Sequence, residues 1–247
     1  MMNVAVSCTV APTLSSTLAG STTSGSADGT GTAASFFVPS SVAADTSGNL
    51  YVADSGNAKI RKITPAGVVT TLAGSGIEGF SNGAATAASF FAPYGVAVDA
   101  AGNVYVADMN NHAIRKITPS GTVTTLAGTG SMGSADGTGT AASFFAPRGV
   151  AVDGIGNVFV ADTSNSKIRK ITPAGVVTKL AGSGAWATTI GSAGYRRHLK
   201  RWGALVAGAR WITRRPPSQS VQGARQAPER SVRAAVCQDA SSGAGMP

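Results

Sequence analysis

The chain has 247 residues, of which 13% are charged and 43% are hydrophobic, with 32 glycines and a formal net charge of +9. The hydrophobic share argues against a chain without a core, and the glycine content is too low for a collagen repeat. Cys8 and Cys237 lie near opposite ends without neighbouring Cys or His residues, so neither a disulfide framework nor a structural zinc site is indicated. Since no run of about 18 apolar residues is present, no membrane-spanning helix is expected.

The main signal in the chain is an internal repeat. The tetrapeptide Thr-Leu-Ala-Gly at Thr17 recurs at Thr71 and Thr125, and a related Lys-Leu-Ala-Gly begins at Lys179. The period is about 54 residues without insertions, and the copies starting at Thr17 and Thr125 match at roughly 39 of those positions. We therefore expect an N-terminal segment, three repeats with the start of a fourth, and a tail. These parts are residues 1–16, residues 17–184 (repeats 17–70, 71–124 and 125–178) and residues 185–247.

The positive charge belongs to the tail. Basic and acidic residues nearly balance over residues 17–182, at about ten against nine, whereas residues 183–247 hold about ten against two. Near Trp202 the tail has apolar residues at helical spacing between basic ones, which is typical of a basic amphipathic helix able to bind anionic lipid or nucleic acid. The polar residues after Pro216 are expected to be disordered.

Each repeat contains its predicted strands in a fixed order. In the second repeat, residues 95–99 and 104–108 are β-branched runs separated by a Gly-Asn pair, which predicts a β-hairpin. Residues 113–117 and 122–126 flank a Thr-Pro-Ser-Gly turn, where proline presets φ and glycine can adopt a positive φ. Each repeat is therefore predicted to be a four-stranded antiparallel meander, and the fold class is all-β.

Apolar side chains lie on both faces of this meander. Val104 and Val106 point away from Tyr105, and Ile114 and Ile117 fall on opposite faces. A sheet that is apolar on both faces must be covered on both, and the natural cover is the neighbouring repeat. Four-stranded repeats packed face to face around an axis form a β-propeller. We therefore expect an incomplete or open propeller of about three blades with a C-terminal tail outside it.

The repeated motifs carry a family resemblance. They are Pro93-Tyr-Gly-Val-Ala-Val-Asp99, Gly102-Asn-Val-Tyr-Val-Ala-Asp108 and Ile114-Arg-Lys-Ile117, and they recur from Pro147 onward. They resemble the NHL-repeat β-propellers, especially the long-repeat bacterial kind. The resemblance covers roughly residues 13–184, where residues 13–18 resemble a lone outer strand. It implies the propeller fold and, only weakly, a function.

Three blades are fewer than a closed propeller needs. Propellers close with about four to eight blades, and the resemblance implies six. One explanation is a truncated or frame-shifted gene, in which the tail from about residue 194 is an out-of-frame reading of a fourth repeat. The other is self-association, in which two arcs close one ring.

The recurring aspartates could suggest metal ligands, but their position at strand ends beside Gly or Asn favours turn capping. They are Asp45, Asp99 and Asp153, and Asp54, Asp108 and Asp162. The repeats contain one histidine, His112, and one glutamate, Glu78, so neither a metal triad nor a His-based nucleophile can be assembled. We therefore expect no catalytic residue, no metal and no cofactor, and we interpret His112 as a loop residue.

The recurring Arg-Lys pairs at Arg61, Arg115 and Arg169 could bind phosphate groups. Because the repeats are nearly neutral, nucleic-acid binding is not favoured and structural pairing between adjacent blades is preferred. The glycine-rich segments at Asp28 and Asp136 lack the Lys-Ser/Thr and the helix of a phosphate-binding loop. They are interpreted as flexible connectors.

The most favoured function is a non-enzymatic scaffold that binds protein, peptide or glycan through loops at one rim. Positions that differ between copies mark the candidate rim: Glu78, Met132, Tyr94, Arg148, Met109 and Asn110. One alternative is a fragment of a propeller lyase or lactonase whose active residues are missing. Another is nucleic-acid or anionic-membrane binding through the tail. The resemblance is compatible with export, although the first residues do not form a signal peptide.

Overall fold

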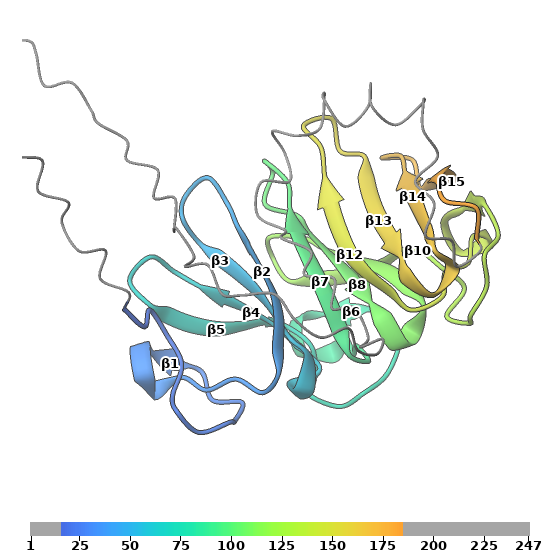
Figure 1. The fold of residues 1–247 in the computed structure, drawn as a ribbon. Coiled ribbons are helices and arrows are strands. Elements are labelled where there is room, and N and C mark those ends of the chain that lie inside the picture. The colour runs from blue at the N-terminus through green and yellow to red at the C-terminus, as the bar shows by residue number, and fades with distance from the viewer. Residues whose placement is uncertain (1–15, 185–247) are drawn as a thin grey trace, which may run out of the picture. The chain divides into compact units, whose positions relative to one another are not determined.

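The computed structural model describes residues 16–184, all within the first of two compact units, residues 1–190 and 191–247 (Figure 1). The predictions for residues 1–15 and for the tail, residues 185–247, lie outside the described residues. The described part contains three antiparallel sheets of five strands each and no α-helix. None of its helices is long and apolar enough to cross a membrane.

The three sheets repeat one strand order, β1-β5-β4-β3-β2 in the first sheet. Its strands are β1 (Gly29–Thr30), β2 (Pro39–Ala44), β3 (Leu50–Asp54), β4 (Lys59–Ile63) and β5 (Val68–Ala73). The second sheet contains β6 (Gly83–Ala84), β7 (Pro93–Val98), β8 (Val104–Asp108), β9 (Ala113–Ile117) and β10 (Thr122–Ala127). The third contains β11 (Gly137–Thr138), β12 (Pro147–Val152), β13 (Val158–Asp162), β14 (Lys167–Ile171) and β15 (Val176–Ala181).

Two short 3₁₀ helices accompany each sheet, one after its first strand in the chain and one between its third and fourth strands. They are η1 (Gly31–Ala33) and η2 (Ser55–Asn57), η3 (Ala85–Ala87) and η4 (Met109–Asn111), and η5 (Gly139–Ala141) and η6 (Thr163–Asn165).

The predicted four-stranded meander is confirmed, and the structure adds a fifth strand that the sequence did not predict. This strand is two residues long and pairs antiparallel with the outer strand of the meander, as Gly29 does with Val69. The interpretation of the glycine-rich segments as flexible connectors was wrong, because Gly137–Thr138 forms β11 and pairs with β15. Each connector therefore becomes the edge of the sheet that follows it.

The sheets pack face to face, with the first meander strands β2, β7 and β12 lying against one another (Figure 1). Ile117 is buried between the first and second sheets, together with Val104 and Val106. Ile114 is buried between the second and third sheets, together with Tyr105. These are the opposite faces that the sequence predicted, so each apolar face of the middle blade is covered by a neighbouring blade.

Backbone hydrogen bonds also join consecutive blades. The N–H of Gly74, which follows β5, donates to Ala85 O at 3.1 Å, and the N–H of Ser75 donates to Ala88 O at 2.8 Å. The helix η3 thereby packs against the outer strand of the preceding blade. Close packing extends to Gly121, where a Cβ would lie 2.9 Å from Leu72 O.

The first described residues repeat this junction. The N–H of Gly20 donates to Gly31 O at 3.0 Å, and the N–H of Ser21 donates to Ala34 O at 2.8 Å, as Gly74 and Ser75 do one repeat later. A Cβ at Gly67 would lie 2.9 Å from Leu18 O, the same distance as that between Gly121 and Leu72 O. Leu18 is not in a strand, but it occupies the place that Leu72 has beside the next blade. Residues 13–15 of the predicted lone strand lie outside the described part.

Candidate functional site

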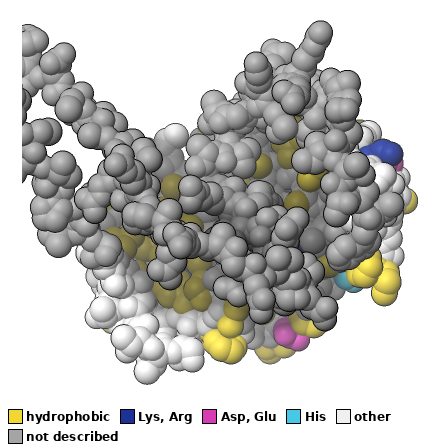
Figure 2. All heavy atoms as spheres, in the orientation of Figure 1, with side chains coloured by type: hydrophobic (Ala, Val, Ile, Leu, Met, Phe, Trp, Pro, Cys, Tyr) yellow, Lys and Arg dark blue, Asp and Glu magenta, His cyan; other side chains and the backbone are white. Residues whose placement is uncertain are grey.

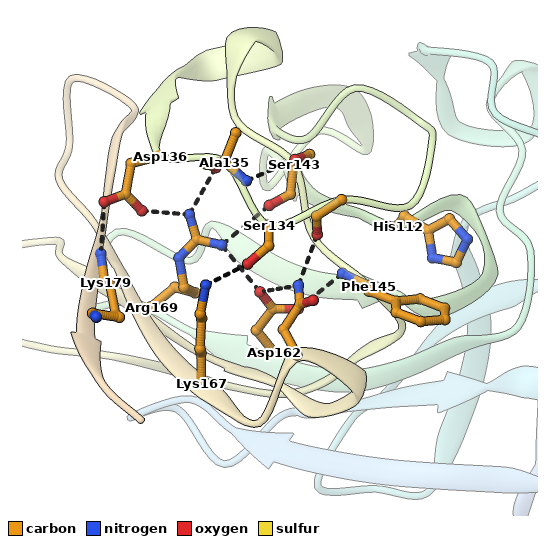
Figure 3. A network of polar contacts seen from close by, with 12 residues as sticks. His112, Ser134, Ala135, Asp136, Ser143, Phe145, Asp162, Lys167, Arg169 and Lys179 are labelled. Atoms are coloured by element: carbon orange, nitrogen blue, oxygen red, sulfur yellow. Dashed lines mark hydrogen bonds and ion pairs between the residues drawn. The ribbon is translucent and has the colours of Figure 1, made fainter. Parts of the chain in front are cut away.

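One arginine in each blade is fully buried: Arg61, Arg115 and Arg169. The guanidinium of Arg115 donates from Nη1 to Asp108 Oδ2 at 2.8 Å and from Nη2 to Asn82 Oδ1 at 2.8 Å. Figure 3 shows the copy in the third blade, where the guanidinium of Arg169 lies between Asp162 and Asp136. Since burying an unpaired guanidinium is costly, the two acceptors fix the arginine and the connector together.

The buried aspartate of each network joins three segments of the chain. Asp108 Oδ1 accepts the N–H of Phe91 at 2.8 Å, and Oδ2 accepts Asn111 Nδ2 at 2.8 Å as well as the arginine. Burial raises the pKa of Asp108 to about 6, although the hydrogen bonds from Asn111 and Phe91 and the charge of Arg115 act to lower it.

Two sequence interpretations of this network were wrong. The arginines do not pair with adjacent blades, because Arg61 binds Asp54 in its own sheet and Asp28 beside the edge strand β1 of that sheet. Asp54, Asp108 and Asp162 do not cap turns, because they ion-pair with arginine and accept an N–H from 17 residues earlier. The sequence signal that was missed is the second acceptor, which recurs 33 residues before each arginine as Asp28, Asn82 and Asp136.

The other aspartates, Asp45, Asp99 and Asp153, cap turns as predicted. Asp99 Oδ1 accepts the N–H groups of Ala101 at 3.0 Å and Asn103 at 2.8 Å, which closes the turn between β7 and β8. Burial acts to raise the pKa of Asp99, but the hydrogen bonds from Asn103 and Tyr105 outweigh it and hold the pKa below its ordinary value. The described residues contain no group of three or more His, Cys, Asp or Glu side chains that could hold a metal ion.

The candidate rim lies at the end of the sheets where β7 begins and β8 ends, since Pro93 pairs with Asp108. Tyr94 on β7 and Arg148 on β12 are in contact there, with the guanidinium 5.4 Å from the ring centroid. Met109 and Asn110 form part of η4, and the N–H of Asn110 donates to Phe91 O at 3.1 Å, one connector residue away from β7. The structure thus brings these four predicted residues to one end.

The last two predicted rim residues occupy equivalent places in two connectors. Glu78 and Met132 are both exposed, and each forms a single bridge with a buried phenylalanine, Phe90 and Phe144 respectively. Gly79 O accepts Asn111 Nδ2 at 2.7 Å, which places the Glu78 connector beside η4. Figure 2 shows exposed hydrophobic side chains on the described part, with few charged side chains among them.

His112 was predicted to be a loop residue, and in the structure its side chain also contacts the next blade. It ends η4 with a φ of 51°, as Ala58 and Ser166 do at the same place in the other blades. Its Nδ1 accepts the N–H of Ala146 in the connector of the third blade at 3.1 Å, and its ring packs edge-on against Phe145 (Figure 3). His112 therefore joins two blades, which nothing in its sequence neighbourhood indicated.

Antiparallel meanders of this kind, packed face to face, are the blades of a β-propeller. The NHL repeat family model matches residues 38–63 and 93–117. These two stretches lie in the first and second blades, so the chain contains NHL repeats there, as the sequence motifs predicted.

The chain spans less than half the length of the curated relative and of the solved structures to which it is similar. The chain is 45% identical over 80 residues to Protein SUPPRESSOR OF QUENCHING 1, chloroplastic, of Arabidopsis thaliana, which is 32% of this chain and 8% of that protein. Among solved structures, it is similar to an auxiliary nutrient binding protein of Bacteroides thetaiotaomicron, with 25% identity, a TM-score of 0.48, and coverage of 57% of this chain and 37% of the other. A protein of unknown function from the same organism has 29% identity, a TM-score of 0.44, and coverage of 53% and 32%.

Proposed function

We propose that this chain is a non-enzymatic binding scaffold that contacts a protein, peptide or glycan through the rim. The observation that carries the proposal is the contrast between the supporting network and the positions beside it. Asp108 and Arg115 have identical counterparts in every blade, whereas the place of Tyr94 is taken by Ser40 and Arg148 in the other two. The buried Asp–Arg network is the same in all three blades, whereas the exposed side chains beside it differ. The three blades therefore present different surfaces, which suits a ligand that does not itself repeat three times.

The chemistry of the rim supports recognition more than catalysis. Tyr94 and Arg148 form a stacked aromatic and cationic pair at the surface, and Met109 adds a flexible apolar side chain at the same end. Tyr and Arg are the residue types that supply most of the binding energy at interfaces, because they combine large contact area with directed polar groups. The pair is held on two β-strands, so little conformational entropy is lost on binding.

A glycan array and a displayed random-peptide library, both probed with the full chain, test this function. We expect a probe whose affinity falls at least about tenfold with Tyr94→Ala and again with Arg148→Ala, since each removes an anchoring side chain. Ile155→Ser is the matched control, because Ile155 is 80% exposed in the β12–β13 turn, at the opposite end of the blade that carries Arg148. Equal binding by the rim variants, or no selected probe, would contradict the proposal.

A further inference from the structure

Each tyrosine in the described part of the chain faces a cationic side chain, and in two of these pairs an aspartate accepts the tyrosine hydroxyl. The two aspartates are Asp45, bound by Tyr51 at 3.1 Å beside Lys62, and Asp99, bound by Tyr105 at 3.0 Å beside Lys116. The third pair is Tyr94 and Arg148 at the rim, with the guanidinium 5.4 Å from the ring centroid. Both of its side chains are exposed, and no carboxylate of residues 16–184 pairs with them.

Arg148 also differs from the other arginines of the described residues. The three buried arginines, Arg61, Arg115 and Arg169, each donate from both Nη atoms to side-chain acceptors. The guanidinium of Arg148 contacts the Tyr94 ring instead, which leaves its N–H groups available to an acceptor from outside these residues. The strand-end aspartates at this end are buried and bound to the arginines, as Asp108 is, so they supply no counter-charge to Arg148.

We propose that the rim binds a peptide segment of a partner protein through the carboxylate of an Asp or Glu side chain, which contacts Arg148 and Tyr94. This inference rests on the proposed function and names its ligand class. A guanidinium donates two parallel hydrogen bonds to a carboxylate from its edge, while its face stays on the aromatic ring. One guanidinium matches the single charge of a carboxylate, whereas a phosphate group carries nearly two charges.

The apolar side chains beside the pair favour a peptide over an acidic sugar. Phe145 precedes Arg148 by three residues and is 37% exposed, and Phe37 has the same place before Ser40 and is 47% exposed. Ser40 Oγ donates to Tyr94 O at 2.7 Å, so the Phe37 segment leads directly to the pair. Apolar side chains of a peptide can cover these rings, whereas sugar hydroxyls there would lose water without gaining a partner. The expected segment therefore has one acidic residue flanked by apolar residues.

Two displayed peptide libraries test the proposal, one with a fixed central Glu and one with Gln in its place, both selected on the full chain. We expect binders from the Glu library, with an affinity that falls at least about tenfold with Arg148→Gln and falls as the salt concentration rises. Lys116→Gln is the matched control, because it removes the cation of a pair that already has its own aspartate, and binding should not change. Circular dichroism checks that each variant retains the fold.

A charge reversal tests the contact in the other direction. Arg148→Glu should lose the peptides selected by the unaltered chain and should select from a library with a fixed central Lys, which a merely structural role of Arg148 does not explain. Selection of Gln peptides whose binding falls with Tyr94→Ala but is unchanged by Arg148→Gln would overturn this inference and leave the proposed function standing. Binding of acidic oligosaccharides without any peptide would also overturn it. Failure to select any probe would overturn both.

Discussion

Asn82 is the exception among the acceptors of the buried arginines. Arg61 and Arg169 pair with the aspartates Asp28 and Asp136 at 2.6 and 2.7 Å, whereas Arg115 donates to the neutral amide oxygen of Asn82. Asp28 and Asp136 are about half exposed, so water weakens their charge contribution. The middle blade thus holds its connector with one charged acceptor and one neutral acceptor.

Asn82→Asp is therefore expected to stabilise the protein, by up to about 1 kcal/mol, because a charge-assisted hydrogen bond replaces a neutral one. The free energy of unfolding in urea measures the change. The reverse substitution, Asp28→Asn, is the control and should lower the free energy of unfolding by a similar amount. A destabilising Asn82→Asp would contradict the equivalence of the three connectors.

The turn aspartates predict an acid limit to stability. The pKa values of Asp45, Asp99 and Asp153 lie below the ordinary value of 3.8, because hydrogen bonds favour the charged carboxylate in the fold. Their contribution is complete above about pH 4 and is lost as the pH falls through the lowered values. Asp108 acts with the opposite sign, since its raised pKa makes stability fall as the pH rises from about 4 to about 6.

We therefore expect the free energy of unfolding to decrease steeply below about pH 4, and to decrease less steeply in Asp99→Asn. Denaturant titrations between pH 2.5 and about 7 measure both slopes. An unchanged slope in Asp99→Asn would show that this carboxylate is not held in its charged form by the turn.

At the scale of the element, two turn glycines allow the cost of backbone strain to be measured apart from the cost of disturbing the packing between blades. Gly102 and Gly121 have positive φ values of 79° and 88°, so alanine is strained at both. A Cβ at Gly121 would also lie 2.9 Å from Leu72 O of the preceding blade, whereas at Gly102 it would meet Pro119 at 3.4 Å. Only the first of these contacts involves backbone of another blade.

Gly121→Ala should therefore cost more than Gly102→Ala, by about 1–2 kcal/mol beyond the roughly 1 kcal/mol that both lose to strain. Thermal unfolding of the two variants measures the difference. Equal losses would mean that the blades can separate locally at this junction without cost.

The sequence predicted those strands and turns whose side chains show a regular pattern. Alternation placed Val104 and Tyr105 on opposite faces, and turn residues placed the hairpins, both correctly. The edge strand was missed because Gly29–Thr30 has no strand propensity of its own and pairs with Val68 and Val69, about 40 residues away. The buried arginine and aspartate were identified as recurring residues, but their contact across neighbouring strands, as between Arg115 and Asp108, was not predicted. The connector acceptor was missed because it lies 33 residues before the arginine.

At the scale of the whole molecule, stability is shared between blades through their faces. Ile114 and Ile168 occupy the same place in their blades, and within the described residues only Ile114 is covered by another blade. In dilute protein, Ile114→Ala should cost about 2–5 kcal/mol and Ile168→Ala clearly less. The free energy of unfolding in urea measures both costs. Equal costs would contradict a contribution of the neighbouring blade at Ile114.

The contacts within each blade join residues at the same separations along the chain. The arginine binds its aspartate 7 residues back, its connector acceptor 33 residues back and a serine carbonyl 26 residues back, in all three copies. In a gene with such repeats, unequal recombination between aligned copies removes or adds one complete period wherever the crossover falls. Every product then regenerates the whole contact set, so the number of blades can change in a single genetic step without disturbing any one of them.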